Sequence, residues 1–204
     1  MKETGLKAIF PGPVTTRARK GDRIYPNLLK DIKIIRPYQA YQTDITYIRT
    51  FYGFMYLVAL IDSFSRYILS WRLSNSLSTE SCLEALTDAL TFFPLPDITH
   101  SDQGCQYTSH AWIDLLILHK VKISMSGQGN SNENGKVERL WRTLKYEYLY
   151  LMGSKDPSNL KKIIAEFVRW YNHERPHQAL DYKTPAEILN LDKDGFFNFT
   201  KKRE

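Results

Sequence analysis

Residues 127–145 of the chain read GQGNSNENGKVERLWRTLK, a polar, glycine-rich loop that leads into an amphipathic helix. Arg142 and Lys145 follow Glu138 at i+4 and i+7, so at about 100° per residue one carboxylate and two cations share a stripe. A separate apolar face would anchor the helix and comprises Val137, Leu140, Trp141, Leu144, Tyr148 and Leu151. Taken alone, the pattern is also typical of a surface helix with an i,i+4 ion pair.

Two aspartates upstream of this helix are predicted in or next to strands. Residues 41–48 alternate polar and apolar side chains, and Asp44 is the one charge among residues 42–48. Residues 97–100 form a short predicted strand with Asp102 just past its C-terminal edge. Two neighbouring strands can bring Asp44 and Asp102 side by side, and the later helix can cross that edge with Glu138.

Three carboxylates in one place repel each other unless cations neutralise them. Hard oxygen ligands suit magnesium or manganese, and two such ions about 4 Å apart can activate a nucleophile and stabilise the leaving oxygen at a phosphodiester. The residues alone also allow Asp44 and Asp102 to be turn or strand-end residues and Glu138 to be solvated. We interpret Asp62, which ends an apolar strand, as a structural hydrogen-bond acceptor.

The remaining elements predict an α/β fold. Residues 54–61 form a continuous apolar run typical of a strand buried on both faces, and a hairpin at 62–65 joins it to a strand at 65–73. A helix capped by Ser76 or Ser78, the short strand, a helix at 111–119 capped by Ser109 and a strand at 121–125 follow. This order indicates a mixed five-stranded sheet with helices on both faces.

Beyond the Glu138 helix, the pattern predicts a helical C-terminal extension. It contains a helix at 157–172, a loop-like segment at 173–185 and a short helix at 186–191. We divide the chain into a basic N-terminal arm or linker (1–40) with a short helical piece near 27–33, a catalytic core (41–153) and the extension (154–204).

The charge of the chain is uneven. Its net charge is +6, and residues 1–40 hold nine Lys and Arg against three Asp and Glu, whereas residues 41–204 hold nineteen of each. The arm is therefore either a segment that contacts phosphate or a solvated basic tail. The hydrophobic fraction of 43% is enough for a real core.

Cysteine usage and hydropathy point to a cytoplasmic protein. Cys82 and Cys105 are the two cysteines, with no CxxC motif and no paired Cys/His spacing, which argues against a zinc module or a disulfide framework. No apolar run near Met1 resembles a signal peptide, and the longest run, the eight residues 54–61, is too short to span a bilayer.

Four segments in a fixed order resemble the DDE transposases of bacterial insertion sequences, a group related to retroviral integrases: QTDITYI, HSDQGCQYTS, ENGKVERLWRTLKYE and YNHERPHQALDYKTP. The resemblance extends from about residue 5 to residue 191. It implies a ribonuclease H-like fold with Asp44, Asp102 and Glu138 as the catalytic triad that binds two Mg²⁺ (or Mn²⁺). It also implies cleavage of DNA at an element's end and transfer of the 3'-hydroxyl to a target.

The resemblance also implies DNA contacts along the helix. Arg142 and Lys145 resemble the basic positions one and two turns after the family's glutamate, where their charge would hold DNA phosphate. Asn134 corresponds to an asparagine before the helix, which would cap the helix or contact DNA. For Lys136 and Arg139, DNA contact and a solvated role both remain open.

The RPH segment, two departures from the family pattern and the loop before the helix complete the comparison with this family. Arg175 and His177 occupy the RPH segment, which we interpret as an ion pair or loop anchor, with DNA contact as the second reading. Tyr41 stands where the family usually has tryptophan. Glu133 stands where an aspartate is common, and we do not take it as the third ligand. The loop 127–131 can move, which suits a site that closes on substrate.

The implied partners are DNA, both the element ends and the target, and further copies of the chain in a homo-oligomer. A separate helix-turn-helix transposase subunit is a further expected partner, because the chain begins within the arm that follows such a region in the family. We expect a cytoplasmic, nucleoid-associated protein that does not have a membrane as a partner. Two alternatives stay open: a truncated, non-catalytic DNA-binding or regulatory fragment, and a nuclease without joining activity.

Overall fold

A five-stranded mixed sheet lies at the centre of the computed structural model, which describes residues 23–127, 134–149 and 157–191. The strands, in the spatial order β3-β2-β1-β4-β5, are β1 (Ala40–Thr50), β2 (Gly53–Asp62), β3 (Ile68–Ser74), β4 (Ile98–Ser101) and β5 (Lys122–Met125). The first three pair antiparallel, whereas β4 runs parallel to β1 and β5 runs parallel to β4. The predicted mixed sheet of five strands is confirmed.

Strand β2 is buried on both faces, as its continuous apolar run predicts. Val58 and Leu60 belong to one hydrophobic cluster, whereas Leu57, Ala59 and Ile61 belong to a second cluster. Successive side chains of a strand point to opposite faces of a sheet, so this alternation places one core on each side.

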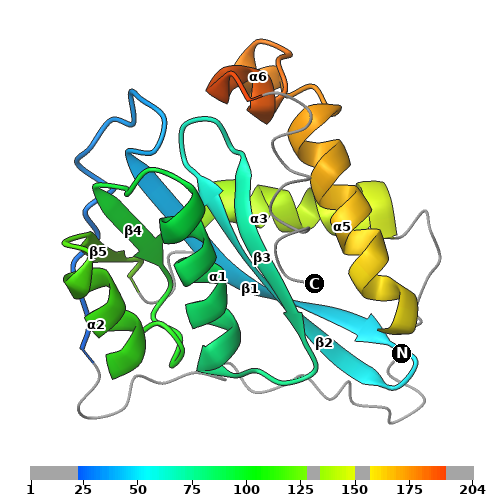
Figure 1. The fold of residues 1–204 in the computed structure, drawn as a ribbon, viewed down its shortest axis with the longest axis horizontal. Helices are drawn as coiled ribbons and strands as arrows, with labels where there is room; N and C mark the ends of the chain where they lie inside the picture. Colours follow the sequence, from blue (N-terminus) through cyan, green and yellow to red (C-terminus); the bar gives the residue numbers. More distant parts are fainter. Residues whose placement is uncertain (1–22, 128–133, 150–156, 192–204) are drawn as a thin grey trace, which may run out of the picture.

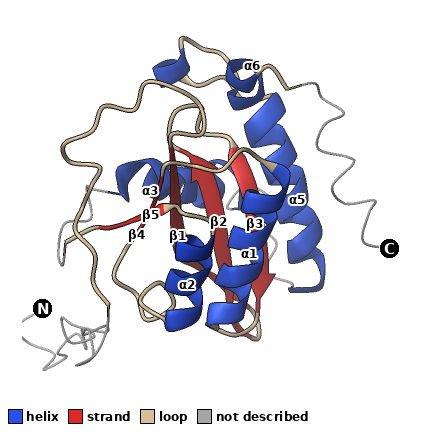
Figure 2. Cartoon of the chain, turned by 60° about the vertical axis from the view of Figure 1, so that its left-hand side comes forward, coloured by secondary structure: helices blue, strands red, loops and turns tan. Residues whose placement is uncertain are grey.

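Helices cover both faces of the sheet. Helices α1 (Thr79–Phe92) and α2 (His110–Leu118) contribute to the first cluster, and α3 (Gly135–Arg142) and α5 (Pro157–His173) contribute to the second. Figure 1 shows α1 and α2 side by side, with α3 passing behind the strands. Figure 2 shows the same layers from the side. None of the helices in the described residues is long and apolar enough to cross a membrane.

The turn between β2 and β3 is organised by Asp62, which is fully buried. Its two carboxylate oxygens accept hydrogen bonds from the Tyr38 backbone N–H (2.9 Å) and from the Ser65 N–H and hydroxyl (2.8 and 2.7 Å). These bonds hold Ser65 in the turn, so β3 begins at Ile68, three residues later than predicted. The interpretation of Asp62 as a structural acceptor is confirmed.

Two short predicted helices differ from the structure. Residues 27–33 form a turn without a helix, because the Asn27 side chain accepts the Leu29 N–H at 2.9 Å and competes with helical bonding. Helix α6 (Pro185–Leu189) has the capping box Thr184–Glu187 and ends before Asn190, whose left-handed backbone (φ 52°) stops it two residues before the predicted end at residue 191. The segment before it contains one 3₁₀ turn, η3 (Gln178–Leu180).

The helix that carries Glu138 changes its geometry after two turns. Helix α3 ends at Arg142 and continues directly into a π-helix, η2 (Thr143–Leu149), whereas one regular α-helix was expected. The apolar side packs as predicted for Val137, Leu140, Trp141 and Leu144, which are all buried. Leu151, Glu133 and most of the predicted mobile loop lie outside the described residues.

Candidate active site

The register between β1 and β4 brings the two predicted aspartates together. Gln42 lies opposite His100 in this parallel pair, so paired residues are 58 positions apart (100 minus 42). Asp44 and Asp102 are separated by the same 58 positions (102 minus 44). Because β1 continues through Asp44 and β4 ends at Ser101, Asp102 leaves the sheet beside Asp44.

Both of the other predicted acids act electrostatically on Asp44. Burial is the largest cause that raises the pKa of Asp44, followed by the negative charge of Asp102 and, more weakly, that of Glu138, and with the opposing hydrogen bonds the pKa lies at about 6. Burial also raises the pKa of Asp102, although its side chain keeps contact with solvent. Each carboxylate therefore lies within the electrostatic reach of Asp44.

Trp141 holds Asp44 in place. Its indole Nε1 donates a hydrogen bond to Oδ2 of Asp44 at 2.9 Å, which opposes the rise in the Asp44 pKa. Trp141 is 7% exposed, and the N–H of a buried indole usually has such a partner. The apolar periodicity of the helix predicts a buried Trp141 but not this polar contact. The sequence does contain one indication of this contact, because Trp141, with its indole N–H donor, lies about one helical turn after Glu138.

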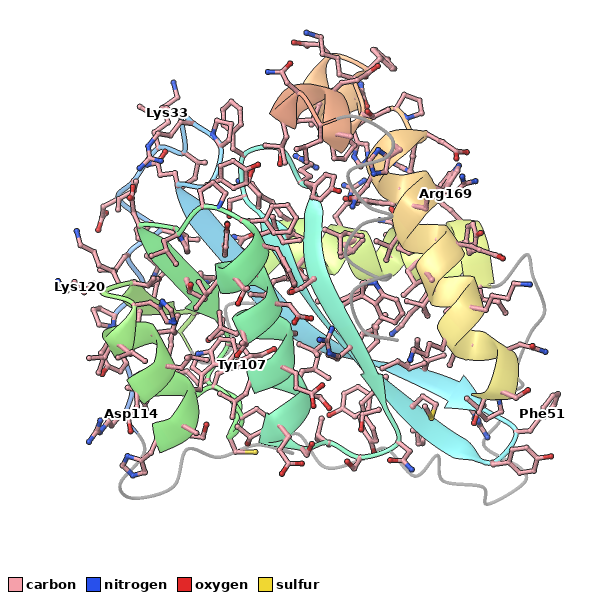
Figure 3. The ribbon with its side chains drawn as sticks, viewed as in Figure 1. Lys33, Phe51, Tyr107, Asp114, Lys120 and Arg169 are labelled. Atoms are coloured by element: carbon pink, nitrogen blue, oxygen red, sulfur yellow. The ribbon has the colours of Figure 1, made fainter. Side chains whose placement is uncertain are left out.

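The loop after β4 is shaped around Asp102. The Gly104 backbone N–H donates to Oδ1 of Asp102 at 2.9 Å, and a Cβ on Gly104 would lie 3.0 Å from the same oxygen, so a larger residue here would press against the Asp102 carboxylate. Further along the loop, the Tyr107 hydroxyl lies 3.3 Å from Oγ1 of Thr43, the residue before Asp44. Figure 3 shows Tyr107 directed into the interior. The loop is therefore tied to the strand that carries Asp44.

The start of α3 is tied to the same strand. Asn134 is 5% exposed, and its Nδ2 donates to the backbone oxygen of Thr43 at 3.1 Å. The side chain makes no capping hydrogen bond, which corrects the expectation of a side-chain cap. Because Asn134 is buried, its side chain offers no surface to DNA in this structure. This contact instead ties the start of α3, the helix that contains Glu138, to the strand that contains Asp44.

The two cations behind Glu138 differ in their surroundings. Arg142 is exposed, whereas Lys145 is half-buried and lies in η2. Burial lowers the pKa of Lys145, and the negative charge of Asp44 opposes that shift, so the ammonium group lies within the electrostatic reach of Asp44. The angle of 100° per residue does not hold beyond Arg142, because a π-helix has more residues per turn.

The other two cations of α3 face elsewhere. Nζ of Lys136 donates to the backbone oxygen of Ser63 at 2.8 Å, which anchors it to the β2–β3 turn, and burial lowers its pKa. Arg139 is exposed. Of these basic residues, Lys145 is thus the one whose pKa is affected by Asp44, whereas Lys136 is bound to the β2–β3 turn.

The RPH segment anchors the C-terminal loop. Arg175 forms a bidentate ion pair with Glu147 on η2, with Nε and Nη2 at 3.0 and 2.8 Å from Oε2. His177 is 5% exposed, packs edge-on against Tyr171 with ring centroids 4.7 Å apart, and donates its backbone N–H to Lys183. The ion-pair and loop-anchor interpretation is confirmed.

The acids offer oxygen donors of the kind that magnesium and manganese prefer. Within the described residues, no three acidic, histidine or cysteine side chains converge to metal-ligand distance, and no ion pair involves Asp44, Asp102 or Glu138. The rise in the Asp44 pKa caused by its neighbours reflects repulsion that a bound cation would relieve. In residue type, the three acids therefore suit a divalent cation.

Comparison with known sequences gives a consistent set of matches. Two family models, each described as Integrase core domain, match residues 35–131 and 119–185. The chain is 36% identical over 197 residues to the transposase InsF for insertion sequence IS3A of Escherichia coli K12, which covers 93% of the chain and 68% of the relative. It is 32% identical over 194 residues to the transposase for insertion sequence element IS629 of Shigella sonnei, which covers 92% and 64%.

The chain spans about two thirds of the length of these curated relatives. Among solved structures, it is similar to the magnesium complex of the HTLV-2 integrase catalytic core domain, with a TM-score of 0.63 and 21% identity over 76% of this chain and 99% of that one. A simian T-cell lymphotropic virus intasome chain gives a TM-score of 0.68 at 19% identity over 86% of this chain and 60% of that one. The ribonuclease H-like fold is therefore confirmed.

Proposed function

Because the chain belongs to the insertion-sequence transposases with an integrase core domain, we propose that it cleaves DNA at the 3' ends of an element and joins them to a target. Asp44, Asp102 and Glu138 are the catalytic residues in this proposal. The reaction is a polynucleotidyl transfer in two steps. Water first attacks a phosphodiester at the element's end and breaks its P–O3' bond, which frees the 3'-hydroxyl of the element. This hydroxyl then attacks a phosphodiester of the target, and the 3'-oxygen of the target strand leaves. The observation that carries the proposal is the β1–β4 register, whose offset brings Asp102 beside Asp44, together with the electrostatic effect of both Asp102 and Glu138 on Asp44.

Two Mg²⁺ or Mn²⁺ ions would be held by Asp44, Asp102 and Glu138. When bound, such ions activate the attacking oxygen and stabilise the leaving one. Support comes from the oxygen donor set and from the mutual repulsion of the acids. The solved HTLV-2 integrase core with magnesium has a similar fold.

The remaining residues of the site position the acids and the substrate. Trp141 orients the carboxylate of Asp44, and Gly104 orients that of Asp102, so neither acid depends on substrate for its placement. Lys145 and Arg142 would hold a DNA phosphate at the site through charge, since both follow Glu138 on the same continuous helical segment.

The partners follow from the same proposal. Element ends and target DNA are the substrates, and joining two ends requires at least two copies of the chain. A separate helix-turn-helix subunit would supply recognition of the element ends. The solved HTLV-2 integrase core has dimeric and trimeric forms, and the simian virus chain belongs to an intasome, which supports assembly of this fold into multimers.

A strand-joining assay tests the proposal. The chain is incubated with a labelled duplex that carries the element end, a supercoiled target plasmid and Mg²⁺ or Mn²⁺, and both nicked and joined products are measured. Glu138→Gln is expected to abolish both products. The matched control is Glu166→Gln, which makes the same change at an exposed position of α5 and should leave both products unchanged.

Retention of wild-type activity by Glu138→Gln would refute the triad. If the wild-type chain forms neither product but lowers the integration frequency of a full-length transposase, the regulatory alternative holds instead. Nicked products without joined products would identify a nuclease that lacks joining activity.

A further inference from the structure

A second basic surface lies on another side of α3 from the acids. It is a groove of about 870 Å³ bounded by the segment before β1, the β2–β3 turn, α3 and the loop after α5. Its cationic lining residues, which define what we term the basic groove, are Arg66, Lys136, Arg139 and Arg175. They come from three separate parts of the chain, so only the folded structure brings them together.

The charge of the basic groove is poorly compensated. Among the described residues that line it, none is acidic. Arg175 forms an ion pair with Glu147. Among the described residues, no ion pair involves Arg66, Lys136 or Arg139. Arg66 is half-buried, so its charge is less screened by water than that of an exposed arginine. The groove therefore presents three cations that an anionic ligand could neutralise.

Besides burial, the positive charge of the groove lowers the pKa values of Lys136 and His177. Burial is the largest cause of the lowered pKa of Lys136 and of His177, and Arg66 lowers both further. Arg175 also lowers the pKa of His177. Positive charge from opposite walls of the groove thus acts on His177, whereas at Lys136 the negative charge of Asp62 opposes the effect of Arg66.

Two polar atoms in the lining lack a partner. Oε1 of Gln42 and Nε2 of His177 are buried without a hydrogen-bond partner among the described residues, and both side chains line the groove. Two lining residues other than glycine, Arg66 and Tyr182, also have left-handed backbone conformations (φ 64° and 61°). Orphaned polar groups and such backbone strain are concentrated at functional sites in proteins.

The groove and the acids use different faces of α3. On a helical wheel, Lys136 and Arg139 lie at about 160° and 100° from Glu138, whereas Arg142 lies at about 40°. The apolar residues occupy the third face, against the sheet. One helix therefore separates two polar surfaces, and a ligand in the groove would not occupy the site of the acids.

We propose that the basic groove binds the phosphate backbone of a DNA strand beyond the segment held at the acids. A second hollow of about 380 Å³ shares Arg66 and Lys136 with the groove and extends it to Asp181 and Lys183. This continuous surface is longer than one free phosphate requires, which favours a polymer. The proposal rests on DNA as the substrate in the proposed function, but binding at the groove is measured without catalysis.

The test compares DNA binding by variants of the 204-residue chain that all carry Glu138→Gln, so that the DNA probe is not cleaved. Binding of a fluorescent mixed-sequence duplex is measured by anisotropy from 50 to 200 mM salt. Addition of Arg66→Gln and Arg139→Gln is expected to weaken binding roughly tenfold and to reduce the slope of log K against log salt by about 1.8, because each neutralised phosphate contributes about 0.9. The matched control adds Lys161→Gln and Lys162→Gln, which remove the same charge at exposed positions of α5.

Equal losses in the groove variant and the control would overturn the proposal, because they would reflect net charge alone. A groove variant that retains duplex binding but loses binding of inorganic phosphate, measured by calorimetry, would overturn it too and identify a small-anion site. If the double variant does not fold, Arg139→Gln alone, at an exposed position, is expected to lower the slope by about 0.9. Failure of catalysis in the wild-type chain leaves these binding results unaffected.

Discussion

Replacement of Trp141 by phenylalanine tests the contact that orients Asp44. The change removes the Nε1 donor, 2.9 Å from Oδ2 of Asp44, and keeps most of the buried ring volume. Hydrogen bonds to charged groups contribute about 1.5–3 kcal/mol, and each 1.4 kcal/mol corresponds to a factor of ten. If this bond holds Asp44 in its reactive position, strand joining at fixed Mg²⁺ should fall roughly 10- to 100-fold.

The assay measures the initial rate of strand joining as a function of Mg²⁺ concentration. Loss of orientation should raise the metal concentration for half-maximal rate, which a purely structural defect would not do. The matched control is Trp112→Phe, because Trp112 is fully buried in the other hydrophobic cluster and its Nε1 has no hydrogen-bond partner within the described part of the chain. It should lower stability with little change in metal dependence.

The reasoning is refuted if folded Trp141→Phe keeps both the wild-type rate and the wild-type metal dependence. Equal behaviour of the two tryptophan variants would also refute it, since the loss would then reflect packing alone. Thermal unfolding of both variants, followed by circular dichroism, provides the check on folding.

Two further predictions concern stability. The pKa of His177 is lowered to about 4, so the folded chain binds the proton more weakly than the unfolded chain. The free energy of unfolding should therefore fall by about 3 kcal/mol in total as the pH drops from about 6.5 to about 4, and then level off. Urea titrations of His177→Phe should show a smaller dependence of this free energy on pH than those of the wild type. Asn172→Ala removes two buried hydrogen bonds to the Ile68 backbone, at 2.8 and 3.0 Å. The free energy of unfolding in urea should fall by about 2–4 kcal/mol, while the metal dependence of strand joining should not change. A fall of less than about 0.5 kcal/mol would contradict the assigned hydrogen bonds.

Much of the architecture could be predicted from local pattern. The apolar run in β2 determines a strand buried on both faces, because its side chains alternate between two cores whatever the neighbouring strands are. Boundaries were less predictable where side chains capture the backbone. Asp62 delays the start of β3 by bonding Ser65, and Asn27 replaces a predicted helical turn, since both depend on particular polar contacts.

The candidate site was only partly visible in the sequence. The separation of 58 positions between Asp44 and Asp102 became meaningful once the β1–β4 register had the same offset. Asn134 was assigned to capping or DNA, but its side chain is buried against Thr43. The π-helix after Arg142 was also unexpected, because a wheel drawn at a constant angle contains no information about a change in helix type.

The sequence by itself determined the order of the elements, the apolar faces and which acids are available, because these depend on local periodicity and residue chemistry. Only the tertiary structure decided that Trp141 donates to Asp44 and that Arg66, Arg139 and Lys136 border one groove. Contacts between residues about 70 to 100 positions apart depend on strand register and helix crossing. Those in turn depend on the packing of the whole core, which no local pattern specifies.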